Sequence, residues 1–184
     1  MPKKKNTEIE LKFLEINPSK VRGRLLKLGA KHFPEEVQKI NVFDFPDYRL
    51  EKQKAVLRLR REHGKTMLCF KKLQKSKKAR QMREIQTEVS SFEKTKQLLE
   101  AIGLKLIGDK EKKRESFKLG KTSLEIDTFP GIPSFLEIEA ENSKEIEKTA
   151  RFLGISMKKA TKMRGEEVLK HYLKDKYSRI WKFQ

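Results

Sequence analysis

Runs in which apolar and polar residues alternate recur along the chain, and this period of two predicts β-strands. The first run covers residues 7–15. Runs at 55–61 and 66–71 flank Gly64 in the pattern of a β-hairpin. Further strands are predicted at 37–45, 83–89, 104–107, 112–119, 122–129 and 135–141.

Three segments instead repeat apolar residues every three or four positions, which is typical of amphipathic helices. The first begins after Asn17, a good N-cap, with Pro18 in the first helical position, and ends near Gly29. The others lie at 91–103 and 143–154, and residues 166–177 are also expected to be helical. Many strands with helices at intervals predict an α+β fold.

The strands share an unusual distribution of charge. Residues on alternate positions of a strand lie on the same face, so Glu8, Glu10 and Lys12 share one face of the first strand. One such strand would be an ordinary surface strand. The arrangement recurs, however, with charges of both signs, in five more segments: Leu57–Arg60, Glu84–Glu88, Lys112–Arg114, Glu125–Asp127 and Glu137–Glu139.

Two architectures explain such strands. An antiparallel sheet with one wet face would show the same pattern. If helices cover the apolar face and the sheet closes, the charged face lines the inside of a barrel. Carboxylates and cations packed together there are costly unless they hold ions and water. They suit a multivalent anion with a divalent metal, since carboxylates bind Mg²⁺ or Mn²⁺ and Arg or Lys neutralises phosphate oxygens.

Composition narrows the class of protein. The 184 residues suffice for one domain, although only 36% are apolar and 39% are charged. Without an apolar stretch long enough for a membrane span or a secretory signal, the expected location is the cytoplasm. Cys69 is the only cysteine, which excludes an intramolecular disulfide. The net charge of +19 fits a lysine-rich surface, a nucleic-acid binder or an enzyme for an anionic small molecule.

The charged segments resemble the CYTH, or triphosphate tunnel metalloenzyme, superfamily. Glu8-x-Glu10-x-Lys12 resembles its ExExK motif, and the remaining segments follow in the family's order over residues 6–165. They are the paired arginines Arg58 and Arg60, a tunnel lysine at Lys71, an acidic strand at 83–88, the K-x-R strand of Lys112 and Arg114, and the closing strands at 125–127 and 135–139.

The resemblance implies an eight-stranded antiparallel β-barrel with flanking helices, formed by a single domain over 1–184 with a helical C-terminal extension at 166–184. It also implies Mg²⁺ or Mn²⁺ as cofactor. The metal-ligand candidates are Glu8, Glu10, Asp127, Glu137 and Glu139. The substrate-binding candidates are Lys12, Arg58, Arg60, Lys71, Lys112 and Arg114. Those expected to act in catalysis are Lys12, Arg58 and Glu88.

Three functions remain open. The leading hypothesis is a metal-dependent triphosphatase acting on inorganic triphosphate, a nucleotide or thiamine triphosphate, as a monomer or homodimer. The second is a class IV adenylate cyclase, although residues 161–163 depart from the Ser-Tyr pair of cyclase-like members, and Gln86 and Lys72 also depart from family patterns. The third is a non-catalytic RNA or polyphosphate binder, which is less favoured because the basic segment 71–83 lacks interleaved aromatic residues.

Substitutions at Glu10 and Arg58 separate the predicted metal site from the predicted phosphate site. Activity of Glu10→Gln should fall and partly recover at higher metal concentration. Arg58→Ala should lose about tenfold to a hundredfold in catalytic efficiency, because a charge-assisted contact to phosphate contributes about 1.5–3 kcal/mol. Added metal should not restore Arg58→Ala. Steady-state kinetics over a range of metal concentrations provides the measurement, and equal, metal-independent losses would contradict the assignment.

Overall fold

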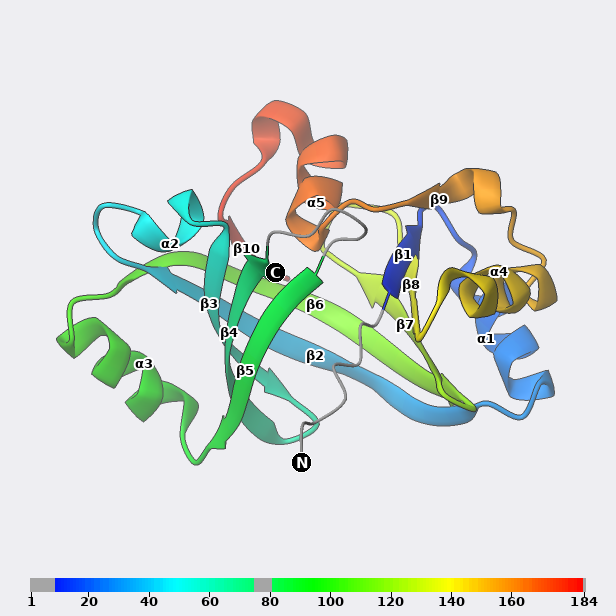
Figure 1. Ribbon diagram of the computed structural model, residues 1–184, viewed down its shortest axis with the longest axis horizontal. Coiled ribbons are helices and arrows are strands. Elements are labelled where there is room, and N and C mark those ends of the chain that lie inside the picture. Colours follow the sequence, from blue (N-terminus) through cyan, green and yellow to red (C-terminus); the bar gives the residue numbers. More distant parts are fainter. Residues whose placement is uncertain (1–8, 75–80, 184) are drawn as a thin grey trace. The chain divides into compact units, whose positions relative to one another are not determined.

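The computed structural model describes residues 9–74 and 81–183 of the chain, so Glu8 lies outside the described residues (Figure 1). The longer strands are β1 (Ile9–Phe13), β2 (Lys31–Asp44), β3 (Ala55–Glu62), β4 (Lys65–Gln74), β5 (Gln81–Val89), β6 (Lys105–Leu119), β7 (Thr122–Thr128) and β8 (Phe135–Ala140), and the two-residue strands are β9 (Ala160–Thr161) and β10 (Ile180–Trp181). The helices are α1 (Pro18–Lys27), α2 (Arg49–Lys52), α3 (Phe92–Ala101), α4 (Ser143–Phe152) and α5 (Gly165–Leu173), with short 3₁₀ turns η1 (Met157–Lys159) and η2 (Lys174–Lys176).

The strands form one hydrogen-bonded sheet in the order β5-β4-β3-β2-β6-β7-β8-β1-β9, with β10 added to β6. The pairings recorded for β1, β3, β4, β5, β7, β8 and β9 are antiparallel, whereas β10 runs parallel to β6. The predicted α+β class with a large antiparallel sheet is therefore confirmed. No helix within the described residues is both long and apolar enough to span a membrane.

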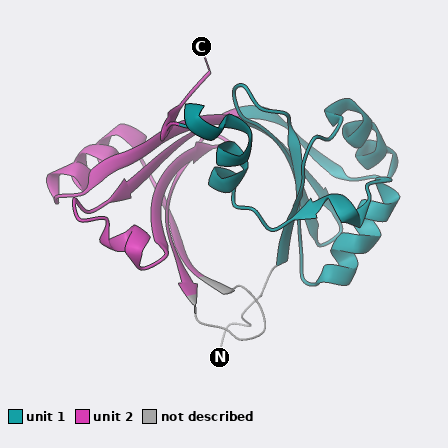
Figure 2. Cartoon of the chain, turned by 90° about the horizontal axis from the view of Figure 1, so that it is seen from above, with its two compact units in different colours: residues 1–36, 113–177 teal, residues 37–112, 178–184 magenta. Residues whose placement is uncertain are grey.

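The chain divides into two compact units, coloured separately in Figure 2. Unit 1 comprises residues 1–36 and 113–177, and unit 2 comprises 37–112 and 178–184. Strands β2 and β6 contribute residues to both units.

The core of unit 1 lies between helices α1 and α4 and one face of the strands. Leu25 of α1 and Ile146 of α4 pack with Phe13, Leu136 and Ile138 from β1 and β8, and all five are fully buried. The strand residues are those at the apolar alternate positions, so the opposite face of the same strands carries the charged residues. The sequence pattern predicted this division.

Unit 2 is built in the same way. Helix α3 contributes Phe92 and Leu99 to a core with Phe43 of β2, Leu59 of β3 and Leu104. Alternation in β3 then places Arg58 and Arg60 on the face away from this core, whereas Arg61 lies on the core side with its guanidinium over the Phe92 ring. Each unit thus has one apolar face covered by helix and one charged face.

Local signals explain several of these elements. The Asn17 side chain accepts a hydrogen bond from the Lys20 amide at 2.9 Å, and Pro18 opens α1 as predicted. The β3–β4 hairpin turns through His63 and Gly64, both at positive φ, as a two-residue hairpin of this kind requires. Ser91 caps α3 in the same manner as Asn17.

Other boundaries differ from the prediction. β6 is one continuous strand where two were expected, and it runs through Gly108 beside Val42 of β2. β2 begins at Lys31, six residues earlier than expected. The C-terminal extension is helical as expected through α5 and η2, but it ends in strand β10. Residues 75–80, in the middle of the basic segment 71–83, lie outside the described residues.

Helix α2 was not predicted, and it depends on one buried carboxylate. Asp44 is 1% exposed and accepts hydrogen bonds from the backbone amides of Phe45, Leu50 and Glu51 at 2.7, 3.0 and 2.9 Å. Tyr48 precedes the helix in the left-handed region. Because the carboxylate satisfies three amides, it holds the connection between β2 and β3.

Replacing Asp44 should destabilise the protein. Asp44→Ala leaves three amides without their acceptor, and we expect the free energy of unfolding to fall by about 2–3 kcal/mol. Asp47→Ala is the matched control, since Asp47 is exposed and its ion pair with Arg49 is solvent-screened. Urea unfolding followed by circular dichroism measures both. Equal, small effects would show that Asp44 does not hold this connection.

Candidate active site

The strand register of unit 1 brings the predicted acidic and basic residues together in rows. Lys12 of β1 lies opposite Glu137 of β8, which lies opposite Glu125 of β7. The next row places Glu10 opposite Glu139. Directly opposed residues of an antiparallel pair share a face, so these five side chains belong to one surface.

Arg114 of β6 binds three of the carboxylates on this surface. Its Nε and Nη2 atoms donate to the two carboxylate oxygens of Asp127 at 2.6 Å each, while Nη1 contacts Glu125. Nη2 also lies 3.5 Å from Oε2 of Glu137. Burial lowers the pKa of Arg114, but the charges of the three carboxylates outweigh it and hold that pKa well above its ordinary value.

Lys12 occupies the adjacent position and is 3% exposed. Its Nζ contacts Glu10 and lies 3.3 Å from Oε2 of Glu137, the same oxygen that faces Arg114. Thr161 of β9, in the segment that departs from cyclase-like members, pairs with Lys12 on its other side. The row around Lys12 therefore runs from Thr161 through Glu137 to Glu125.

This surface has the donor chemistry for a hard divalent cation. It presents five carboxylates against two cations, and Mg²⁺ and Mn²⁺ prefer oxygen ligands. Among the described residues, no three acidic, His or Cys side chains are already placed to hold one ion. The carboxylates are instead interleaved with Lys12 and Arg114. The donor types fit a metal, and Glu10, Glu137 and Glu139 would supply oxygen ligands.

The charged face of unit 2 is dominated by cations. Arg58 and Arg60 of β3 lie opposite Cys69 and Met67 of β4. Lys71 of β4 lies on the same face by alternation. The predicted phosphate-binding residues of β3 and β4 therefore share one surface.

A carboxylate on β5 holds Lys71. Lys71 Nζ lies 2.8 Å from Oε2 of Glu84, and the Cys69 thiol donates to the other oxygen of Glu84 at 3.1 Å. Burial raises the pKa of Glu84, but hydrogen bonds from Lys71 and Cys69 outweigh it and lower that pKa. Burial and the Glu84 hydrogen bond raise the pKa of Cys69 to about 11, so the thiol is neutral at pH 7.

A second carboxylate orients Arg60. Its Nη2 donates to Oε1 of Glu62 at 2.6 Å, and Gln38 donates to the other oxygen at 3.2 Å. The buried Nε of Arg60 has no hydrogen-bond acceptor among the described residues. Arg60 is thus fixed at one end by Glu62.

The structure adds residues that the site prediction omitted. Glu125 contacts Arg114, Glu84 holds Lys71, and Lys110 is 8% exposed beside the predicted Lys112, which is 6% exposed. Each has a sequence signal, because each continues the alternating pattern of its strand: Glu125-x-Asp127, Glu84-x-Gln86-x-Glu88 and Lys110-x-Lys112-x-Arg114. Glu62, two residues after Arg60, has the same kind of signal.

Glu88 pairs with a lysine that is not among the predicted site residues. Its side chain is 53% exposed and pairs with Lys65 at 2.8 Å, although the register places it on the row of Arg60 and Met67. Its assignment to catalysis stays a prediction, as does the metal-ligand assignment of Glu8, which lies outside the described residues.

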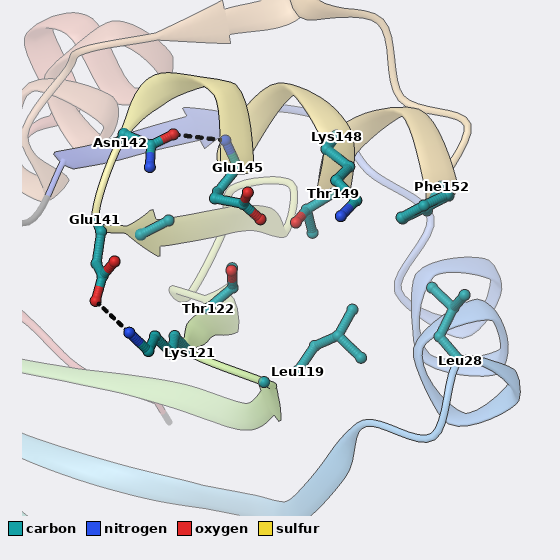
Figure 3. Close-up of a pocket in the computed structure, with 12 residues that line it drawn as sticks. Leu28, Leu119, Lys121, Thr122, Glu141, Asn142, Glu145, Lys148, Thr149 and Phe152 are labelled. Carbon is teal, nitrogen blue, oxygen red and sulfur yellow. Dashed lines mark hydrogen bonds and ion pairs between the residues drawn. The ribbon is translucent and has the colours of Figure 1, made fainter.

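The grooves of unit 1 lie apart from most of these residues. One of about 530 Å³ lies between α4 and the β6–β7 turn, where Lys121, Thr122 and Lys148 line it (Figure 3). No predicted site residue lines it. A second, of about 410 Å³, includes only Glu139 from the site. We place the candidate site on the charged strand faces because their side chains carry the relevant chemistry.

One buried carboxylate lies on the opposite, apolar face of unit 1. Glu115 of β6 is 2% exposed and binds Arg22 of α1 through two hydrogen bonds of 2.7 Å. His32 of β2 lies 2.7 Å from the same carboxylate and stacks on Phe117 with ring centres 4.8 Å apart. Burial raises the pKa of Glu115, but the hydrogen bonds from Arg22 and His32 outweigh it and lower that pKa.

Comparison with known proteins identifies the family. The CYTH domain matches residues 6–170. A Methanocaldococcus jannaschii protein, provisionally named an adenylate cyclase, is 31% identical over 143 residues, which is 77% of this chain and 81% of the relative. The fold and charged strands thus define a CYTH domain, and the chain belongs to the CYTH family.

Solved structures agree on the fold. A Pyrococcus horikoshii protein matches with a TM-score of 0.71 at 27% identity, over 88% of this chain and 98% of that chain. A Hippeastrum protein matches with a TM-score of 0.56 at 18% identity, over 80% of this chain and 87% of that chain. The latter is described as a provisional adenylyl cyclase with a dominant triphosphatase activity, and at that identity the likeness concerns the fold alone.

The lowered pKa of Glu115 makes stability depend on pH. Its pKa is lower in the folded protein than the usual 4.5, so its contribution is present above that value and lost as the pH falls through the folded pKa. The difference in unfolding free energy between wild type and Glu115→Gln should therefore be largest near neutral pH and shrink in acid. Urea unfolding at a series of pH values measures it. A difference independent of pH would contradict the role of the charge.

Proposed function

We propose that the chain is a divalent-metal-dependent hydrolase of inorganic or organic triphosphates. The observation that carries the proposal is the pair of charged strand faces, one in each unit. Unit 1 combines five carboxylates with Lys12 and Arg114, and unit 2 presents Arg58, Arg60 and Lys71. Such faces suit a polyanion accompanied by a metal.

The proposed role of each residue follows from its chemistry. Arg58, Arg60 and Lys71 would neutralise phosphate oxygens, with Glu62 and Glu84 fixing two of these side chains. Arginine suits this role because its planar guanidinium binds two oxygens at once.

Hydrolysis requires that a water oxygen bond to the terminal phosphorus while the bridging P–O bond breaks. Cys69 lies among the cations, but its pKa of about 11 keeps the thiol protonated, so direct attack by water is favoured over a cysteine intermediate. A metal held by Glu10, Glu137 and Glu139 would supply Lewis-acid stabilisation of the phosphate charge. We also propose that the sheet closes into the tunnel typical of the family.

The second candidate is a class IV adenylate cyclase, in which the ribose 3′-hydroxyl replaces water as the nucleophile. The name of the M. jannaschii relative favours it. Thr161, beside Lys12, stands in the segment that departs from cyclase-like members. We therefore favour hydrolysis. Binding of RNA or polyphosphate without catalysis remains the third candidate, motivated by the charge of +19.

A product-resolved assay tests the proposal. Inorganic triphosphate, thiamine triphosphate and ATP are incubated with Mg²⁺, Mn²⁺ or EDTA, and products are separated by ion-exchange chromatography. We expect phosphate release from at least one substrate and a loss of at least about a hundredfold in EDTA, because metal stabilisation of phosphate charge contributes several kcal/mol. Cyclic AMP with pyrophosphate would identify the cyclase instead. No metal-dependent turnover of any substrate would exclude both enzymes.

A further inference from the structure

Two substrate-binding candidates of unit 1 are already neutralised by metal-ligand candidates. Lys12 contacts Glu10 and Glu137, and Arg114 binds Asp127, Glu125 and Glu137. A phosphate oxygen approaching either cation must therefore compete with carboxylates of the same face. Equally, a metal approaching these carboxylates must compete with the two cations.

One oxygen atom links both cations. Oε2 of Glu137 lies 3.3 Å from Lys12 Nζ and 3.5 Å from Arg114 Nη2. Both distances exceed those of a short charge-assisted hydrogen bond, so neither contact is optimal. Glu137 thus bridges the two cations without being held tightly by either.

Asp127 differs from Glu137 in each of these respects. Both its oxygens accept 2.6 Å hydrogen bonds from Arg114, and its side chain is 2% exposed, compared with 14% for Glu137. Removing Asp127 from Arg114 would break a buried bidentate pair and leave charges uncompensated, which is strongly unfavourable. Withdrawing Glu137 breaks two long contacts while Arg114 keeps Asp127 and Glu125. Glu137 is therefore exchanged more easily than Asp127.

We propose that Glu137 is an exchange ligand that couples metal binding to phosphate binding. Without metal, the Glu137 carboxylate faces both Lys12 and Arg114; when a divalent cation takes it, one of the carboxylates that compete with phosphate at each cation is withdrawn, while Glu10 stays on Lys12 and Glu125 on Arg114. Asp127 stays on Arg114 as a positioning residue. This inference rests on the proposed function, since it assumes that this face binds a metal and a triphosphate.

The exchange has a thermodynamic signature in the protein itself. If the metal releases the cations, it tightens triphosphate binding, and by linkage triphosphate tightens metal binding by the same factor. Mg²⁺ and triphosphate also associate in solution, so the coupling of the wild-type protein alone does not isolate Glu137. Each ligand must be measured without the other, in variants that remove one side of the exchange.

The first experiment measures inorganic triphosphate binding by calorimetry in EDTA. Glu137→Gln removes the competing charge with little change of shape, so it should bind triphosphate about tenfold more tightly than wild type, the equivalent of one charge-assisted hydrogen bond. Glu141→Gln is the matched control, because Glu141 follows β8 but pairs with the exposed Lys121 at 3.1 Å. The Glu141→Gln variant loses the same charge, and its affinity for triphosphate should stay within about twofold of wild type.

The second experiment measures Mn²⁺ binding without phosphate, from the loss of the electron paramagnetic resonance signal of free Mn²⁺. Lys12→Gln should bind Mn²⁺ about tenfold more tightly, because Glu137 and Glu10 lose their competing cation. Lys121→Gln is the charge-matched control and should bind as wild type does. Circular dichroism establishes that each variant is folded.

The outcomes separate the exchange from the proposed function. If Glu137→Gln binds triphosphate no better than Glu141→Gln, or Lys12→Gln binds Mn²⁺ no better than Lys121→Gln, the exchange is wrong even where wild type hydrolyses triphosphate. If wild type binds neither probe and hydrolyses nothing, the proposed function fails as well. Tighter binding by both variants, with unchanged controls, supports the exchange.

Discussion

The need to balance charges buried on a strand face governs the structure of unit 1. The bidentate pair between Arg114 and Asp127 lies almost entirely out of solvent, with side chains 9% and 2% exposed. Desolvating two such groups costs several kcal/mol each, which only close contacts and additional hydrogen bonds offset. Asp127 therefore has to lie directly opposite Arg114 across β6 and β7, and the register does place it there. A one-residue slip of β7 would turn Asp127 into the apolar core and leave Arg114 without its bidentate partner.

The same need to balance buried charge applies to Glu115, which lies on the apolar face of unit 1. Glu115 is adjacent to Arg114 on β6, so alternation turns it toward the helices and away from the charged surface. A carboxylate there needs its own partners, and Arg22 and His32 supply them. Arg22 comes from α1 and His32 from β2, so the charge ties a helix and a strand to β6. Phe117, stacked on His32, fixes the imidazole plane.

Much of the charged surface could be predicted because strand alternation is a local property. Which of Glu8, Glu10 and Lys12 share a face follows from spacing alone, whatever the strand pairs with. The partners of each side chain, in contrast, are not determined locally. Glu125 and Glu137 converge on Arg114 because β6, β7 and β8 pair in a particular register, which the sequence pattern does not encode.

The element boundaries that were predicted wrongly also depend on contacts that are not local in the sequence. Gly108 looks like a break between two strands, but β6 runs through it beside Val42 of β2. Helix α2 is only four residues long and depends on the Asp44 cap, so it has too few apolar positions for a helical period to be visible.

The paired charges also bear on how one fold serves different reactions. If Arg58, Arg60 and Lys71 bind phosphate oxygens as proposed, they meet similar groups in inorganic triphosphate and in a nucleotide, and would discriminate poorly between the two. Selection of the nucleophile must involve groups that vary beside this shared chemistry. Thr161 lies at such a position, because β9 pairs it with Lys12 while its hydroxyl accepts a hydrogen bond from the Met163 amide at 3.2 Å. This hydrogen bond holds the Thr161 hydroxyl close to its own backbone beside Lys12.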